Sequence, residues 1–171
     1  MLFLLFQLGH DRYALEARRA VEVIPFLALK QIPHAPRGVA GIFNYRGRPV
    51  PALDLCELTF GRPARERLST RIIVVQFPDA RGQAQYLGLI AEHATGMMRR
   101  EPTEFIRTGV TVGEAPYLGP VVMDDHGVIQ LLHAEHLLTE TVRHLLSAEA
   151  AAVGIPGGLT GVSPAADSFA P

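Results

Sequence analysis

The chain has 171 residues but a single cysteine, Cys56, and no tryptophan. One cysteine excludes an internal disulfide and a metal site built on several thiolates. Lysine is nearly missing as well, since Lys30 is the only one and almost all cations are arginines. With 16 basic and 17 acidic residues the formal net charge is −1, which gives no long-range attraction to nucleic acid or to an anionic membrane.

Long apolar runs are also missing. The apolar start, MLFLLFQL at 1–8, has no basic region before it and no small-residue cleavage site, and GHDR follows directly. This argues against a signal peptide, and no run approaches the roughly 20 apolar residues of a membrane-spanning helix. We therefore expect a cytoplasmic protein without direct membrane insertion, in which 2–8 is the first β-strand.

Short apolar runs separated by Gly, Pro and polar turns make up the body of the chain, the pattern of an all-β domain. The length suits one domain, or two small subdomains that share a core. The expected strands are Leu2–Leu8, Tyr13–Glu16, Ala20–Ile24, Val39–Tyr45, Arg48–Leu55, Arg71–Phe77, Tyr86–Glu92, Ala94–Arg99, Tyr117–Met123 and Gly127–Leu132.

Helices are expected in two places. A short helical turn should follow the fifth strand, at Glu57–Phe60 or at Ala64–Leu68. A C-terminal helix is expected within 134–153, because its leucines and valine recur at helical spacing and a glycine follows. The Gly-, Pro-, Ala- and Ser-rich segment 155–171 has the composition of a flexible tail.

Pro49 and Pro51 stand two residues apart in one expected strand, so their missing N–H groups would point in the same direction. A hydrogen-bonded ladder cannot form on that side, and this stretch should be a sheet edge or a bulge.

A weak internal repeat has an offset of 80 residues: Gly47–Leu58 aligns with Gly127–Leu138, each a turn glycine, an apolar strand and a Glu-containing turn that ends in Leu. The strands at 2–8 and 13–16 recur in outline at 72–77 and 86–92. The repeat predicts two similar small β-barrels packed side by side.

Residues 32–55, IPHAPRGVAGIFNYRGRPVPALDL, carry a more specific pattern. This block resembles the CheW-like domain of bacterial chemotaxis coupling proteins, whose pattern leaves the position before Arg-Gly open to any residue. The matching residues are Pro33, Pro36, Gly41, Ile42, Phe43, Asn44, Arg46, Gly47, Pro51, Asp54 and Leu55. Val21–Pro25 and Gly88–Glu92 give further support, although the family usually has a branched residue at Ala20 and Val-Asp at Ala91-Glu92.

The resemblance implies a mainly β fold of two intertwined SH3-like five-stranded barrels within 1–146, the second at about 70–132. It also implies a non-catalytic cytoplasmic scaffold with no cofactor, recruited to membrane receptor arrays. Its expected partners are the regulatory domain of a CheA-type histidine kinase and the cytoplasmic tip of a methyl-accepting receptor.

The residues that match the family's receptor contacts are Glu22, Gly41 and Arg46. We expect Arg46 at a hairpin tip, where a guanidinium can make two parallel hydrogen bonds, and Glu22 as the residue that holds it. Asn44, Gly47, Pro51 and Asp54 are expected to support the motif, the glycines through backbone geometry and Asp54 through bonds to local backbone. Kinase contacts should be exposed apolar strand residues at a barrel end, which the sequence does not identify.

Other interpretations stay open at this point. Arg46 could be a solvated turn residue, and Glu22 could pair with Arg18 or Arg19. A small β-barrel module that binds nucleic acid or another ligand would need a basic groove with exposed aromatics, which the composition does not suggest. A metalloenzyme could use His133, His136 and His144, but their spacing is not that of a known zinc motif, so we expect no metal and no catalytic residue.

Overall fold

The computed structural model describes residues 1–109, 113 and 115–152, and it contains every one of the ten expected strands. The strands are β1 (Leu2–Leu8), β2 (Asp11–Glu16), β3 (Ala20–Pro25), β4 (Val39–Tyr45), β5 (Arg48–Asp54), β6 (Arg71–Pro78), β7 (Ala84–Ala91), β8 (His93–Arg99), β9 (Leu118–Asp124) and β10 (Gly127–Leu132).

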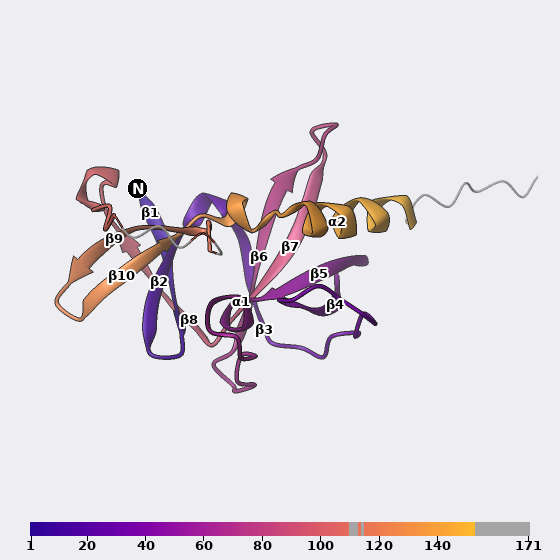
Figure 1. Cartoon of the computed structure of the whole chain (residues 1–171), viewed down its shortest axis with the longest axis horizontal. Helices are drawn as coiled ribbons and strands as arrows, with labels where there is room; N and C mark the ends of the chain where they lie inside the picture. The colour runs from indigo at the N-terminus through magenta and orange to yellow at the C-terminus, as the bar shows by residue number, and fades with distance from the viewer. Residues whose placement is uncertain (110–112, 114, 153–171) are drawn as a thin grey trace, which may run out of the picture.

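The strands form two five-stranded sheets that lie side by side (Figure 1). The first sheet has the order β8-β1-β2-β10-β9, and the second has the order β3-β6-β7-β5-β4. The fold is mainly β with two SH3-like subdomains, as expected.

The internal repeat is visible in this order, because β1–β5 and β6–β10 occupy equivalent places. In the first sheet β10 pairs in parallel with β2, and in the second sheet β5 pairs in parallel with β7. Each sheet nevertheless combines two strands of one repeat with three of the other. The segment at about 70–132 therefore contributes to both sheets, and the two subdomains are exchanged along the chain, with β6 and β7 pairing beside β3–β5.

The largest apolar cluster lies between the sheets and joins them. Phe6, Leu8 and Leu15 from the first sheet pack in one cluster with Ile73 and Leu89 from the second. Strand β6 explains how: side chains alternate across a strand, so Ile73 and Val75 face the shared cluster while Ile72 and Val74 belong to a second cluster with Phe43 and Tyr45. A strand buried on both faces has the continuous apolar sequence that 72–75 shows.

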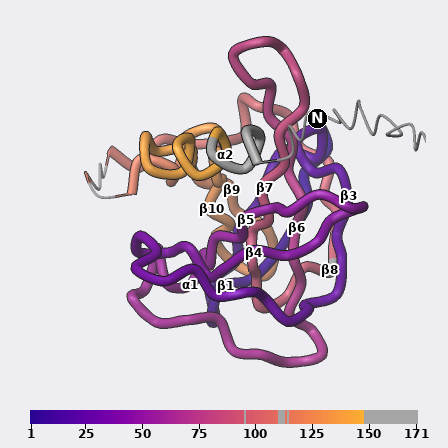
Figure 2. Tube along the Cα trace, turned by 90° about the vertical axis from the view of Figure 1, so that its right-hand side faces the viewer, coloured from indigo at the N-terminus to yellow at the C-terminus, as the bar shows by residue number. Residues whose placement is uncertain are grey.

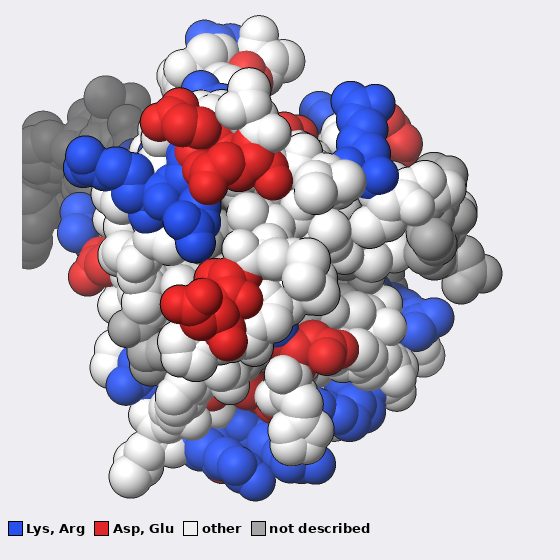
Figure 3. Space-filling model, turned by 90° about the vertical axis from the view of Figure 1, so that its left-hand side faces the viewer, with Lys and Arg blue, Asp and Glu red and all other residues white. Residues whose placement is uncertain are grey.

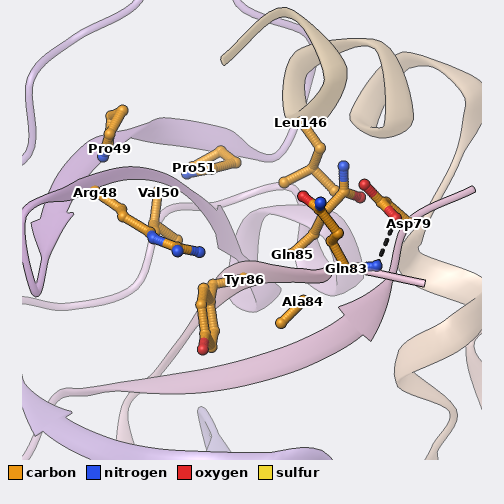
Figure 4. A pocket seen from close by; sticks show the side chains of 10 residues that line it. All are labelled: Arg48, Pro49, Val50, Pro51, Asp79, Gln83, Ala84, Gln85, Tyr86 and Leu146. Atoms are coloured by element: carbon orange, nitrogen blue, oxygen red, sulfur yellow. Dashed lines mark hydrogen bonds between the residues drawn. The ribbon is translucent and has the colours of Figure 1, made fainter. Parts of the chain in front are cut away.

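The paired prolines of β5 lie where a ladder ends. Strand β5 pairs with β4 from Arg48 onward, but its parallel ladder with β7 runs from Ala52 to Asp54. The two strands part at Pro51, as the missing N–H groups predicted, and a hollow of about 210 Å³ opens between them. In Figure 4 the prolines line one side of this hollow, Tyr86 and Gln85 the other, and Leu146 reaches it from the C-terminal helix.

The helices are short. Helix α1 (Leu55–Phe60) occupies the first of the two places expected for a helical turn. Near the C-terminus, the expected helix divides into a 3₁₀ turn (Ala134–Leu137) and helix α2 (Glu140–Ala152), which lies next to β5 (Figure 2) and buries Val142 and Leu146. The proposed tail at 155–171 lies outside the described residues. None of the helices in the described part of the chain is long and apolar enough to cross a membrane.

Candidate functional site

The connection between β4 and β5 is a two-residue turn made by Arg46 and Gly47. Both residues have positive φ, 52° and 80°, as the type I′ turns of tight hairpins require. The Asn44 side chain accepts a hydrogen bond from the Gly47 N–H at 2.8 Å, which supports the turn. Glycine adopts this backbone without strain, but an arginine there costs about 1 kcal/mol or more.

Arg46 and Glu22 form an ion pair, so the structure brings together two of the three residues expected to bind a receptor. The Arg46 Nη2 donates to Glu22 Oε2 at 3.0 Å, and the Tyr45 hydroxyl donates to the same oxygen at 2.9 Å. Glu22 lies on β3 and Arg46 follows β4, and these are the two edge strands of the second sheet. The pair therefore joins opposite edges of one barrel while the Arg46 side chain stays 71% exposed.

A shallow apolar groove lies beside Glu22, between β3 and the first sheet. It has a volume of about 250 Å³. Val21 and Val23 flank Glu22 in β3 and face outward, and Met97 of β8 is 53% exposed. The groove was not predicted from the sequence, although the alternation of Val21, Glu22 and Val23 is the signal of an edge strand with one apolar face. The groove is lined by Leu4, Ala17, Ala20, Val21, Glu22, Val23 and Met97.

Gly41 lies apart from this ion pair, in the interior of β4. It is buried, and its neighbour Ile42 makes a pair of backbone hydrogen bonds with Lys30, of 2.8 and 2.9 Å. A Cβ at position 41 would lie 2.5 Å from the Lys30 carbonyl oxygen and 3.0 Å from Leu29 Cβ. Gly41 allows two backbone segments to approach closely.

Asp54 caps helix α1. Its Oδ1 accepts the N–H groups of Cys56 at 2.9 Å and Glu57 at 3.1 Å, and its Oδ2 accepts the Ala64 N–H at 2.8 Å. The residue is 5% exposed. These bonds to local backbone give Asp54 the structural role expected from the sequence.

Glu92 stands at the junction between β7 of the second sheet and β8 of the first, and it binds two separate segments, the β1–β2 turn and the loop that contains Arg62 and Arg65. Its carboxylate accepts the Gly9 N–H at 2.7 Å, the Arg65 N–H at 2.9 Å and the Arg62 guanidinium at 2.8 Å. The hydrogen bond from Arg62 is the main cause that lowers the Glu92 pKa to about 2, with the two backbone N–H groups adding to it against burial. Glu92 departs from the family pattern, but no local feature of the sequence predicts this junction.

Exposed apolar side chains also gather at the far end of the first sheet, on its edge strand β9 and the strands next to it. Met123 of β9 is 66% exposed, and it lies opposite Val128 of β10, which is 53% exposed. Ile106 pairs with the same strand at Val121 and is 64% exposed. We call Ile106, Met123 and Val128 the end patch. Figure 3 views the molecule from the side where Figure 1 draws β9 and β10, and it shows small acidic and basic clusters with uncharged surface between them.

The histidines near the C-terminus contact each other and the protein backbone. The rings of His133 and His136 lie 5.4 Å apart, and His136 Nδ1 is 2.9 Å from the Pro116 carbonyl oxygen. Across residues 1–109 and 115–152, no group of three or more His, Cys, Asp or Glu is placed to hold a metal ion.

A family model described as "CheW-like domain" matches residues 2–142. The chain belongs to this family. The chemotaxis protein CheW of Helicobacter pylori is 29% identical to this CheW-like chain over 103 residues, which are 60% of this chain and 59% of that relative. The aligned part thus spans less than two thirds of the length of the Helicobacter pylori protein.

The same CheW-like architecture appears in a solved structure, the scaffolding protein TtCheW from Thermoanaerobacter tengcongensis. The two structures superpose with a TM-score of 0.71 at 20% sequence identity, covering 82% of this chain and 89% of the other. That likeness concerns the fold. Membership of the family favours a CheW-like scaffold over the alternative of a nucleic-acid-binding barrel.

Proposed function

We propose that this CheW-like chain is a non-catalytic cytoplasmic adaptor that couples a chemoreceptor-type sensor to a CheA-type histidine kinase at membrane receptor arrays. The observation that carries the proposal is the exposed Glu22–Arg46 pair, of which Glu22 also lines an apolar groove. Glu22 and Arg46 are the residues through which the family resemblance implies receptor binding.

The groove and the ion pair together suit a helix of the receptor tip. An amphipathic helix binds by placing its apolar face in a hydrophobic groove, and Val21, Val23 and Met97 supply such a surface here. A guanidinium has five N–H donors, and the bond to Glu22 uses one of them. The others can reach a carboxylate or a backbone carbonyl of the receptor helix.

The backbone of Arg46 supports a functional role for its side chain. A non-glycine residue with positive φ is strained, and such strain is found where a particular side chain is needed at that position. Glycine would satisfy the turn with less strain, so the backbone of the turn does not by itself call for an arginine at this position.

The end patch is the proposed kinase-facing surface. Ile106, Met123 and Val128 are exposed apolar strand residues at a barrel end, which is where the sequence analysis expects the kinase domain to bind. The patch is built from β9, β10 and Ile106, and the groove from β1, β3 and β8, so the two partners would use different strands. Each interface would be small and weak, and binding strength would come from many linked contacts in an array.

The direct test is binding of the purified chain to two proteins of its own organism, the kinase regulatory domain and the cytoplasmic hairpin of a receptor. We expect weak, reversible binding to each, and formation of a ternary complex. Absence of binding to both proteins at high micromolar concentration would end the adaptor proposal.

The substitution Arg46→Ala should weaken receptor binding about tenfold, as loss of a central arginine does at many interfaces. The free energy of unfolding should change by less than about 1 kcal/mol, because an exposed ion pair contributes little. Isothermal titration with the receptor hairpin and urea denaturation measure the two quantities. Arg81→Ala, which removes an exposed arginine from the β6–β7 turn, is the matched control and should change neither. A large loss of stability in Arg46→Ala would instead mark a structural role.

The end patch and the groove each contain an exposed methionine, which allows a crossed test. Met123→Ser should weaken kinase-domain binding about tenfold and leave receptor binding unchanged, whereas Met97→Ser should do the reverse. Both partners are titrated against both variants. Equal effects of the two substitutions on both partners would contradict the assignment of separate surfaces.

A further inference from the structure

Tyr45 stands at the position that the family pattern leaves open to any residue, yet in this chain it contacts both Glu22 and Arg46. Its hydroxyl lies 2.9 Å from Glu22 Oε2, the oxygen that also accepts from Arg46. Its ring lies under the Arg46 guanidinium, whose central carbon is 5.1 Å from the ring centroid. Tyr45 itself is 5% exposed, in contrast to the arginine beside it.

The aromatic ring of Tyr45 is held from two sides. Phe43 lies 6.4 Å away on the same face of β4, and Tyr86 of β7 meets the ring edge-on at 5.3 Å. Tyr86 in turn lies under Arg48, with the guanidinium carbon 6.0 Å from its centroid, in the hollow beside the prolines (Figure 4). A ring packed in this way has little rotamer freedom, so its hydroxyl is aimed at Glu22.

The hydroxyl is a donor at neutral pH. Burial raises the Tyr45 pKa, the hydrogen bond to Glu22 raises it further, and Arg46 acts in the opposite direction. A hydrogen bond to a charged acceptor is about twice as strong as a neutral one. Without it, Glu22 would be held by an exposed arginine whose long side chain loses entropy when it is ordered.

We propose that Tyr45 is a positioning residue of the Arg46-Gly47 turn. Its hydroxyl holds Glu22 and its ring supports Arg46, so that the Arg46 guanidinium is presented in its binding geometry. This inference rests on the proposed function, since it concerns how the same site engages a receptor. It adds a residue that the family pattern does not specify, and it predicts that receptor affinity depends on a buried hydroxyl that no receptor atom touches.

The same contact also joins β3 to β4, the two edge strands of the second sheet. A purely structural role in closing the barrel is therefore the rival explanation. The two differ in one respect: a positioning residue acts through Arg46 and loses its effect on binding when Arg46 is absent, whereas a structural residue does not.

The test is a double-mutant cycle on the full chain, with the receptor hairpin as probe. Tyr45→Phe keeps the ring and removes the hydroxyl, and it should weaken binding about fivefold. In the Arg46→Ala background, Tyr45→Phe should cause no further loss. Tyr86→Phe, which keeps the neighbouring ring, is the matched control and should bind like the unaltered chain. Urea denaturation of every variant accompanies the titrations.

Two results would overturn the positioning role while leaving the docking site intact. One is unchanged affinity of Tyr45→Phe where Arg46→Ala is weakened, and the other is an equal loss by Tyr45→Phe with and without Arg46. Unchanged affinity of both single variants would overturn the docking site as well, which separates failure of this inference from failure of the proposed function.

Discussion

Replacing Gly41 by alanine should lower the free energy of unfolding by about 3 kcal/mol, one of the two largest effects we expect in this chain. The added Cβ would lie 2.5 Å from the backbone oxygen of Lys30, at a φ of 150° that side chains rarely adopt. Because the obstacle is backbone, and is itself bonded to Ile42, it cannot turn aside as a flexible side chain could.

The matched control is Gly47→Ala. Gly47 also has a positive φ, of 80°, but no atom lies within 4 Å of the added Cβ. It should cost about 1 kcal/mol, from the backbone strain alone. Urea denaturation of both variants separates the free-energy cost of the close approach from the cost of the positive φ, since Gly41→Ala incurs both costs and Gly47→Ala only the second.

Receptor binding by Gly41→Ala distinguishes the two roles considered for this residue. We expect that binding declines in proportion to the folded fraction, because Gly41 is buried and acts on the groove through the position of β4. A variant with the stability of the unaltered chain that nevertheless fails to bind the receptor would show that Gly41 contacts the partner directly.

Glu92→Gln should destabilise the chain by a similar amount, about 3 kcal/mol at neutral pH, which follows from a pKa that folding lowers from 4.5 to about 2. The substitution keeps the shape but removes the charge that Arg62 pairs with. It also turns an amide NH₂ toward the N–H of Gly9 or of Arg65, which leaves a partly buried donor without its acceptor.

The pH dependence has a definite sign. A carboxylate whose pKa is lower in the folded chain stabilises it at pH values above its unfolded pKa. This contribution is lost as the pH falls from about 5 toward about 2. The unaltered chain should therefore lose stability over that range faster than Glu92→Gln does, and the difference between the two curves isolates Glu92 from Asp124, whose pKa is also lowered, chiefly by the hydrogen bond from Arg12.

Glu66→Gln is the matched control for this substitution, since Glu66 is an exposed carboxylate in the same loop as Arg62 and Arg65. It should leave the free energy of unfolding at neutral pH unchanged. If the free energy of unfolding falls with pH equally fast in the unaltered chain and in Glu92→Gln, the charge of Glu92 is not what stabilises the junction.

The local pattern was sufficient for the strands because a strand's alternation and its turn residues are encoded within a few positions. The prolines of β5 show this well: the missing N–H groups predicted where a ladder must end, and the strands part there. The Arg46-Gly47 turn and the bonds of Asp54 to local backbone are equally local, and both were predicted from the types of residue present.

Longer-range contacts could not be predicted in this way. Glu92 lies 83 positions from Gly9 and 30 from Arg62, and no periodicity links residues so far apart. The Tyr45 hydroxyl meets Glu22 only after two edge strands have been brought together. The apolar residues of the groove and of the end patch look in the sequence like any others in a half-buried strand.

The sequence by itself determined a mainly β chain of two repeats and placed Arg46 on a hairpin turn, because turn chemistry and strand alternation act over neighbouring residues. Only the tertiary structure decided that the repeats exchange strands, that the Tyr45 hydroxyl joins the expected pair of Glu22 and Arg46, and which apolar side chains stay exposed. These depend on which strands pair and which faces become buried, and the hydrophobic effect that drives burial carries no direction along the chain.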